Sequence, residues 1–452
     1  MIEQPPSGQM PPNLTPWPAY APQPRPTARA SVVQSVVTSL LVIFAFAAGW
    51  FGNTLVKPAT TTVNSDRYAQ QILDAYNIIS DQYVDTSAID HKKMAYAAID
   101  AMVTSLGDTG HSRFETPDEV KAENQFLQNV PTVGVGIFIS GGGAKPLRID
   151  EVIPGSPADG HLKAGDIITA VDGKDVTGQT IDQVRPQIIG KQDTSVVLTV
   201  QRAGESAPRD IKLTREPFSV PLVATYVIPG VNLAYIQLTQ FAENSQDSSN
   251  STDALLRVAL RRSDVQHAAG IILDLRENPG GLLDQAVSVA SEFVPAGSGH
   301  NVYIQRSRTS RTPAPVVAGG LATRAPLAII VNGDTASAAE IVAGAVAYNR
   351  PTVHIIGEHT FGTDTLLTPI TLSDGSVLLL GTNGWLTPDG KNIRATGIVP
   401  DQPVQLPDGV TLLNPTLASE MHLTSDQLQA AGSDPQLVQA IKDLAPAGAL
   451  TP

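Results

Sequence analysis

The sequence predicts an α/β core that carries a small β-rich insertion and follows a helical N-terminal part with one transmembrane helix. Within residues 216–405, strand-like apolar runs at 269–275 and 327–331 are each followed by a helical run. This alternation is typical of layered α/β proteins. Residues 131–215 instead alternate β-branched runs with glycine turns, which indicates a separate domain built of short strands.

Composition excludes several classes of function. The chain has 452 residues, a net charge of -13 and no cysteine. The negative charge argues against nucleic acid as the main partner. The lack of cysteine excludes disulfides, thiolate metal sites and a cysteine nucleophile. Because the eight histidines form no HExxH pattern and no GxxxxGK[ST] stretch is present, we expect no metal, no cofactor and no nucleotide site of the P-loop type.

A run of twenty uncharged residues, 32–51, lies near the N-terminus. As a helix it is long enough to cross a bilayer core of ~30 Å, so residues 31–52 are predicted to be a transmembrane anchor. Arg25 and Arg29 precede the run and Asp66 follows it. This asymmetry favours an N-terminus in the cytosol and a single-pass protein of the cell membrane whose larger part is extracytoplasmic.

Two alternatives stay open for this run. A cleaved signal peptide would explain the small-x-small triplet at 45–47, although the preceding tail is long for one. A buried core helix would also explain the apolar composition. Residues 1–30 are rich in proline and are expected to be a disordered cytosolic tail, followed after the anchor by a polar linker at 53–64.

The regions flanking the two folded domains carry helical signals. Residues 65–130 have apolar residues at helical spacing, which predicts an N-terminal helical part. Residues 406–452 form a tail that prolines interrupt. Near its end, Ser433 or Asp434 is expected to cap a short helix with Pro435 in the first turn.

Four short motifs in residues 131–215 resemble those of a PDZ domain and occur in the same order. They are GVGI at 134–137, PGSPA at 154–158, AGDII at 164–168 and VDG at 171–173. The resemblance implies that a polypeptide C-terminus adds as a strand and that a loop holds its carboxylate. That loop would be Gly134, Val135, Gly136 and Ile137. The alternative is a domain that only supports its neighbour.

Ser337 lies between the predicted strand at 327–331 and a predicted helix at 336–348. A hydroxyl residue at a strand-to-helix turn is where a hydrolase can present a nucleophile, because the first helical N–H groups face the developing oxyanion. Glu340 falls in the first turn of that helix, where a carboxylate suits the helix dipole.

A second strand-to-helix turn carries the sequence Asn278-Pro279-Gly280-Gly281 before a predicted helix at 282–293. Paired glycines let backbone N–H groups approach a bound group closely, so this turn could supply half of an oxyanion hole. Just before it, Asp274 and Arg276 either pair with each other or line the cleft, and we favour pairing.

Together these segments resemble the carboxyl-terminal processing peptidases, also called tail-specific proteases. The likeness runs from about residue 65 to 445 and includes ILDLRENPGGLL, TASAAEIVAGA, GEHTFG, ITLSDGSV and GIVPD. It implies a ClpP/crotonase-like core and a serine endopeptidase that cleaves proteins near their C-termini outside the cytosol. Ser337 would be the nucleophile, with Ala338 and either Gly280 or Gly281 as oxyanion donors.

One position departs from the family pattern. The family pairs its serine with a lysine in the stretch TFGKG, and here Thr363 occupies the lysine position. Leu367 likewise stands where the family usually has glutamine. A serine hydroxyl needs a base to remove its proton, and threonine cannot accept that proton at neutral pH. Losing such a base typically costs about 10²–10⁴-fold in rate.

Several residues could replace the lysine. His359 and His354 are candidate bases because imidazole titrates near neutral pH. Asp364 could orient a water or a histidine, although we expect it to be a solvated loop carboxylate. Lys391 could reach the serine but fits a hairpin turn better. The remaining interpretation is a catalytically impaired or inactive pseudoprotease that only binds peptides. Nothing in the sequence decides the oligomeric state, and an oligomer is compatible with it.

Overall fold

The computed structural model describes residues 65–108, 111–407, 410, 412–428 and 434–445. The predicted cytosolic tail, anchor and linker at 1–64 lie outside these residues, as does Ser433. Among the residues that are described, none of the helices combines the length and the apolar character needed to span a bilayer.

The chain forms two compact units, divided after Ala101, and each is described by itself. The first unit contains α2 (Ser65–Gln82), a short 3-10 turn (Thr86–Ala88) and most of α3 (His91–Thr104). Tyr76 on α2 lies against His91 at the start of α3, with its hydroxyl 3.0 Å from the imidazole Nδ1. This contact joins the two helices into a hairpin.

The second unit opens with a strand that the helical prediction for 65–130 missed. Strand β1 (Arg113–Glu115) pairs antiparallel with β20 (Val377–Leu386). It precedes α4 (Pro117–Leu127), whose capping box joins Thr116 and Glu119. The local helical spacing was outweighed here by long-range pairing, which a periodicity argument does not include.

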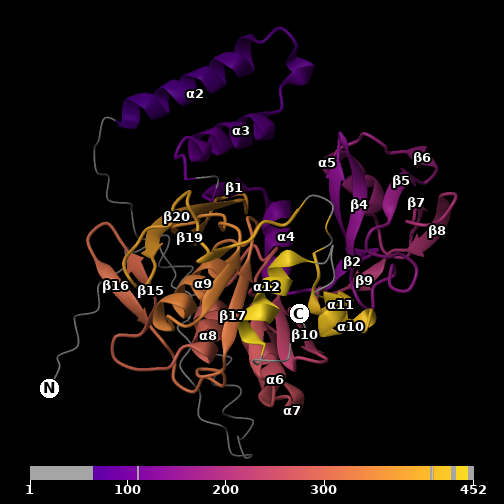
Figure 1. Ribbon diagram of the computed structural model, residues 1–452. Helices are drawn as coiled ribbons and strands as arrows, with labels where there is room; N and C mark the ends of the chain where they lie inside the picture. The colour runs from indigo at the N-terminus through magenta and orange to yellow at the C-terminus, as the bar shows by residue number, and fades with distance from the viewer. Residues whose placement is uncertain (1–64, 109–110, 408–409, 411, 429–433, 446–452) are drawn as a thin grey trace, which may run out of the picture. The chain divides into compact units, whose positions relative to one another are not determined.

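The β-rich insertion has its own sheet and core (Figure 1). Strands β2 (Thr132–Gly134) and β9 (Glu216–Phe218) pair antiparallel where the chain enters and leaves it. The sheet has the order β3-β4-β5-β7-β8, with β6 on β5. These strands are β3 (Ile137–Gly142), β4 (Lys145–Val152), β5 (Ile167–Val171), β6 (Lys174–Asp175), β7 (Ser195–Gln201) and β8 (Arg209–Thr214), and the helix is α5 (Ile181–Ile188).

The core is built on a six-stranded sheet in the order β10-β11-β14-β17-β18-β21. Strands β10 and β11 are antiparallel and the remaining neighbours are parallel. Their bounds are β10 (Val223–Ile228), β11 (Leu233–Leu238), β14 (Gly270–Asp274), β17 (Leu327–Val331), β18 (His354–Gly357) and β21 (Gln402–Pro403). Strands β14 and β17 are buried throughout, as expected for parallel strands covered on both faces.

Helices cover both faces of this sheet (Figure 1). Alternate residues of β14 show the division: Ile271 and Leu273 pack on one face, and Ile272 packs on the other. The first face is covered by α6 (Thr252–Arg261), α8 (Leu283–Phe293) and α9 (Ala338–Asn349). The second is covered by α12 (Pro435–Leu444), through Leu437, Ala440 and Ile441.

A second sheet in the order β1-β20-β15-β16, with β19 on β20, completes the core. Its other strands are β15 (Asn301–Arg306), β16 (Arg311–Pro315) and β19 (Thr365–Thr371). The remaining elements are β12 (Glu243–Asn244), β13 (Asp247–Ser251), α7 (Ser263–Gln266), α10 (Pro415–Glu420) and α11 (Ser425–Leu428). Strand β19 begins directly after Thr363 and Asp364, so this sheet adjoins the position at which the family has its lysine.

Candidate active site

Ser337 lies at the N-cap of α9 with φ +53° and ψ -116°. A non-glycine residue with positive φ is uncommon and costs on the order of 1–3 kcal/mol unless its surroundings hold it. This conformation is that of a nucleophile on a sharp strand-to-helix turn. Ser337 forms a capping box with Glu340, in which the Ser337 side chain faces the Glu340 N–H and the Ser337 N–H donates to the Glu340 carboxylate.

Glu340 holds this turn in place. Its carboxylate is fully buried and accepts hydrogen bonds from the Ser337 N–H (2.9 Å) and from the N–H groups of Gly362 (2.7 Å) and Thr363 (2.9 Å). The Thr360 hydroxyl also donates to it. The first-turn position was predicted, but the contacts go further, because one carboxylate joins the start of α9 to the segment 360–363.

Thr363 lies directly beside the serine. Its hydroxyl accepts the Ser337 N–H at 2.8 Å and donates to Glu340 at 2.7 Å, and its side chain is buried. Thr363, which stands at the position of the family's lysine, therefore contacts the backbone of Ser337. A hydroxyl fixed as donor to a carboxylate cannot also take the serine proton, so Thr363 has a positioning geometry rather than that of a base.

The glycine turn meets the serine turn. A Cβ on Gly280, where φ is +101°, would lie 2.8 Å from Ser337 Cβ and 2.9 Å from the Ala338 nitrogen. The Gly280 N–H donates to Asn278 Oδ1 at 2.9 Å. The N–H groups of Gly281 and Ala338 have no acceptor among the described residues. These two amides are therefore the ones free to bind an oxyanion.

Asn278 connects this turn to the neighbouring strand, which the sequence analysis did not anticipate. Its side chain is fully buried; besides accepting from Gly280, it donates to the Leu238 carbonyl at 2.7 Å. Its own carbonyl accepts the Ala336 N–H at 2.9 Å. The asparagine before Pro279 was the available signal, because Asx side chains commonly close such turns.

The candidate bases named from the sequence have other partners. His354 is exposed and pairs with Asp401 at 2.5 Å, and this partner raises the pKa of the imidazole. His359 is exposed and bonds the Thr396 carbonyl. Lys391 is exposed and pairs with Asp389 at 2.8 Å. None of these three contacts involves Ser337.

The prediction for Asp364 was wrong. It was predicted to be a solvated loop carboxylate, but it is 3% exposed. The Asn392 side chain donates to it at 2.8 Å, and Arg306 lies 3.4 Å away. The carboxylate can be buried because amide and guanidinium donors from β15 and the 391–394 loop offset its loss of hydration.

Asp274 and Arg276 pair, as favoured from the sequence, and they extend further. Arg276 contacts Asp274 at 2.6 Å and Asp434 at 2.5 Å, and all three side chains are fully buried. Burial opposes the charge of Arg276, but the two carboxylates hold its pKa well above the ordinary value. Asp434 also caps α12, as predicted. The network therefore holds the N-terminus of α12 against the segment that leads into the glycine turn.

In the inserted domain, Gly134 ends β2 and Ile137 begins β3, with Val135 buried between them. Gly136 has φ +78° and its carbonyl accepts the Ile153 N–H at 2.9 Å. The N–H groups of Val135 and Gly136 have no acceptor among the described residues. Apart from a bridge between its last residue, Gly142, and Thr180, strand β3 pairs only with β4. The rest of its other edge carries no strand in the described sheet.

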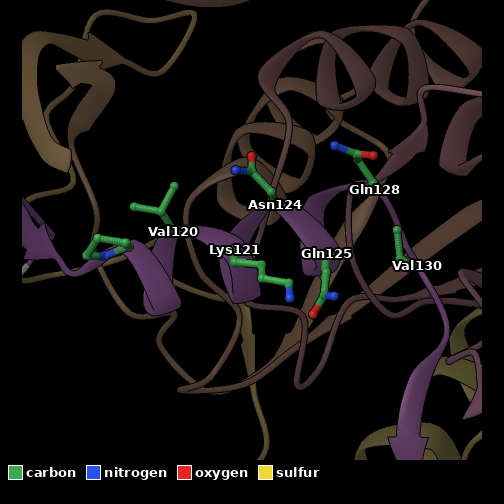
Figure 2. A pocket seen from close by; sticks show the side chains of 7 residues that line it. Val120, Lys121, Asn124, Gln125, Gln128 and Val130 are labelled. Carbon is green, nitrogen blue, oxygen red and sulfur yellow. The ribbon is translucent and has the colours of Figure 1, made fainter. Parts of the chain in front are cut away.

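A pocket of about 430 Å³ lies along α4, away from the residues considered so far. Figure 2 shows Lys121, Asn124, Gln125 and Gln128 projecting from this helix into view, with Val130 beyond it. The lining contains one charged side chain and no nucleophile, so the chemistry of a hydrolase does not reside there.

Comparison with known proteins agrees with this geometry. A model of peptidase family S41 matches residues 232–404, and a PDZ-domain model matches residues 148–202. Over 375 residues the chain is 32% identical to a carboxy-terminal-processing protease of Bartonella bacilliformis, covering 81% of this chain and 83% of that protein. The chain belongs to peptidase family S41. As an S41 member it combines a mixed α/β protease fold with a PDZ domain.

Two further relatives extend the comparison. A CtpA-like serine protease of Staphylococcus aureus is 30% identical over 417 residues, which cover 90% of the S41 chain and 76% of that protein. A solved S41 protease of Bacteroides fragilis superposes with a TM-score of 0.52 at 20% identity, covering 82% of this chain and all of that one. The latter likeness concerns the fold alone.

Proposed function

We propose that this S41 protein is an active serine endopeptidase that cleaves polypeptides near their C-termini through Ser337. The observation that carries the proposal is the strained Ser337 at the N-cap of α9 beside the two unbonded amides of Ala338 and Gly281. Attack by its hydroxyl on a peptide carbonyl would give an acyl-enzyme, with the oxyanion bound by those amides. Water would then release the product.

The PDZ domain would deliver the substrate. A polypeptide C-terminus can add as a strand to the open edge of β3, and the free amides of Val135 and Gly136 can hold its terminal carboxylate. Phe138 on this strand is 46% exposed and offers an apolar contact to the bound chain. The domain family supports binding of polypeptide C-termini.

We also propose that residues 31–52 anchor the protein in the cell membrane with the protease outside the cytosol. The support is the uncharged run and the placement of Arg25 and Arg29 before it. A membrane-bound full chain should resist extraction by alkaline carbonate. A chain lacking 31–52 should be extracted.

The activity is tested with a fluorophosphonate, which acylates activated serines, and with a peptide whose products are weighed by mass spectrometry. Wild type should be labelled at Ser337 and should cut the peptide. Ser337→Ala should do neither, and Ser310→Ala, an exposed loop serine, should behave as wild type.

A second candidate function, a peptide-binding pseudoprotease, is favoured by one observation: Thr363 stands in the lysine position beside Ser337. It would bind the same peptide through the PDZ domain. Under that function the peptide mass would stay unchanged after long incubation, and Ser337 would stay unlabelled.

A further inference from the structure

The serine lacks a base among the residues named from the sequence, and a half-buried imidazole lies near the missing lysine. His111 Nδ1 contacts the Thr365 hydroxyl. Thr365 comes two residues after Thr363, the residue that binds the Ser337 N–H. Two residues of chain span at most about 7 Å. The contact between His111 and Thr365 therefore lies close to the turn that carries Ser337.

The position of His111 is fixed by its neighbours. Strand β1 follows it and pairs with β20, with Arg113 opposite Leu379. The adjacent Ser112 is buried, and its hydroxyl accepts the Gly381 N–H at 2.9 Å. A Cβ on Gly381 would lie 2.9 Å from Thr365 Cβ. The same stretch of β20 thus holds both the histidine segment and the threonine.

The electrostatic surroundings favour a neutral imidazole at neutral pH. Burial lowers the pKa of His111, and the cation of Arg113 lowers it further. The carboxylates of Asp108 and Asp364 act in the opposite direction but do not reverse the shift. A neutral imidazole can accept a proton, whereas an imidazolium cannot.

We propose that His111 is the proton acceptor for Ser337 and acts through the hydroxyl of Thr365. As the Ser337 oxygen bonds to the substrate carbonyl carbon, its proton passes across bridging water to Thr365 while the Thr365 proton moves to His111 Nδ1. The imidazolium returns this proton along the same path to the leaving nitrogen as the C–N bond breaks. Water then attacks the ester and gives a proton to His111 along the same path, and the imidazolium returns it to the Ser337 oxygen as the C–O bond breaks, which regenerates the serine.

This inference rests on the proposed peptidase activity, and the experiment separates the two. The rate of fluorophosphonate labelling of Ser337 and kcat/KM for a peptide are measured in the full chain from pH 5 to 9. His111→Ala should lose about 10²–10⁴-fold in both rates, while peptide binding by the PDZ domain stays unchanged. Added imidazole should restore part of the lost rate.

The pH profile gives a second readout. In wild type, both rates should rise with pH through an apparent pKa below 6.5, the ordinary value from which His111 is lowered. In His111→Ala this limb should disappear. His359→Ala, which alters an exposed histidine of the neighbouring turn, should keep the wild-type rate and profile.

The relay is tested by a pair of variants that does not touch the imidazole. Thr365→Val removes the hydroxyl at nearly constant volume and should lower kcat by tenfold or more with KM little changed. Thr365→Ser keeps the hydroxyl and should retain activity. A His111→Ala protein that labels at the wild-type rate with the wild-type profile overturns this inference alone. A wild-type chain that neither labels nor cuts overturns it together with the proposed peptidase.

Discussion

At the scale of single residues, Asn278 links the two halves of the site. Its side chain donates to the Leu238 carbonyl and accepts the Gly280 N–H, with no exposure to solvent. Asn278→Ala leaves both groups without a partner, and each buried unsatisfied group costs about 1–3 kcal/mol. We expect a lower free energy of unfolding in urea and a lower kcat per folded molecule.

The matched control is Asn278→Asp. Its carboxylate can still accept from Gly280, but it cannot donate to Leu238. If the asparagine serves catalysis by holding the glycine turn, the aspartate variant should recover more kcat than the alanine variant at similar stability. Equal kcat in both variants and wild type would mean that the side chain only stabilises the fold.

Sequence reasoning reached some of these residues and not others. Ser337, Ala338 and the glycines stand in local strand-to-helix patterns, so their neighbourhoods follow from short windows. The burial of Asp364 depends on Asn392 and Arg306, which approach it only in the folded sheet. His111 meets Thr365 from 254 positions away. Spacing along the chain carries no signal for such pairings.

At the scale of elements, the open strand β3 carries a prediction about peptide binding. Phe138→Asp places a charge where an added strand would lie, and affinity for a C-terminal peptide should fall at least tenfold. Fluorescence polarisation of a labelled peptide measures it. Lys212→Glu alters an exposed residue of β8, the opposite edge of the same sheet, and should leave affinity unchanged. Equal losses in both variants would argue against β3 as the docking edge.

Helix α12 carries a second prediction through its cap. Asp434 is the partner of Arg276 and also accepts the N–H groups of Gln436 and Leu437. Removing one partner of a buried ion pair leaves the other charge buried and unpaired. Asp434→Ala should therefore lower the free energy of unfolding by about 3–5 kcal/mol. Lys442→Ala, on the exposed face of α12, should stay within about 0.5 kcal/mol of wild type. A small effect of Asp434→Ala would show that Asp274 alone satisfies the arginine.

The bounds of helices and strands, too, were predicted where the signal is local and missed where it depends on long-range pairing. The strand expected at 327–331 is found at Leu327–Val331, and the helix expected at 282–293 is found at Leu283–Phe293. Strand β1 was missed, because its only signal is its pairing with β20. Buried parallel strands can be recognised in a sequence as apolar runs. A three-residue edge strand is too short to show a hydrophobic period.

At the scale of the whole second unit, one carboxylate links the PDZ domain to the C-terminal segment. Burial raises the pKa of Glu151 to about 7; a hydrogen bond from Asn414 partly offsets this and the charge of Glu420 adds to it. The unfolded chain has the ordinary value of 4.5. Between these values the folded state binds the extra proton, so the contribution of Glu151 to stability is full below pH 4.5 and is lost as pH rises through about 7.

Glu151→Gln removes this titration. Thermal unfolding between pH 5 and 8 should show a flatter decline of Tm with pH in the variant than in wild type. Glu216→Gln, at an exposed position of β9, should retain the wild-type slope. A Glu151→Gln protein with that same slope would mean that the carboxylate stays ionised in the fold.

The ion pair between Arg276 and Asp434 spans 158 positions of the chain. Contacts of such long range form late, because a large loop must close first. During synthesis, Arg276 leaves the ribosome well before Asp434 exists, so this ion pair forms only when the last helix docks. A copy that ends before Asp434 therefore lacks one of the two carboxylates that pair with Arg276.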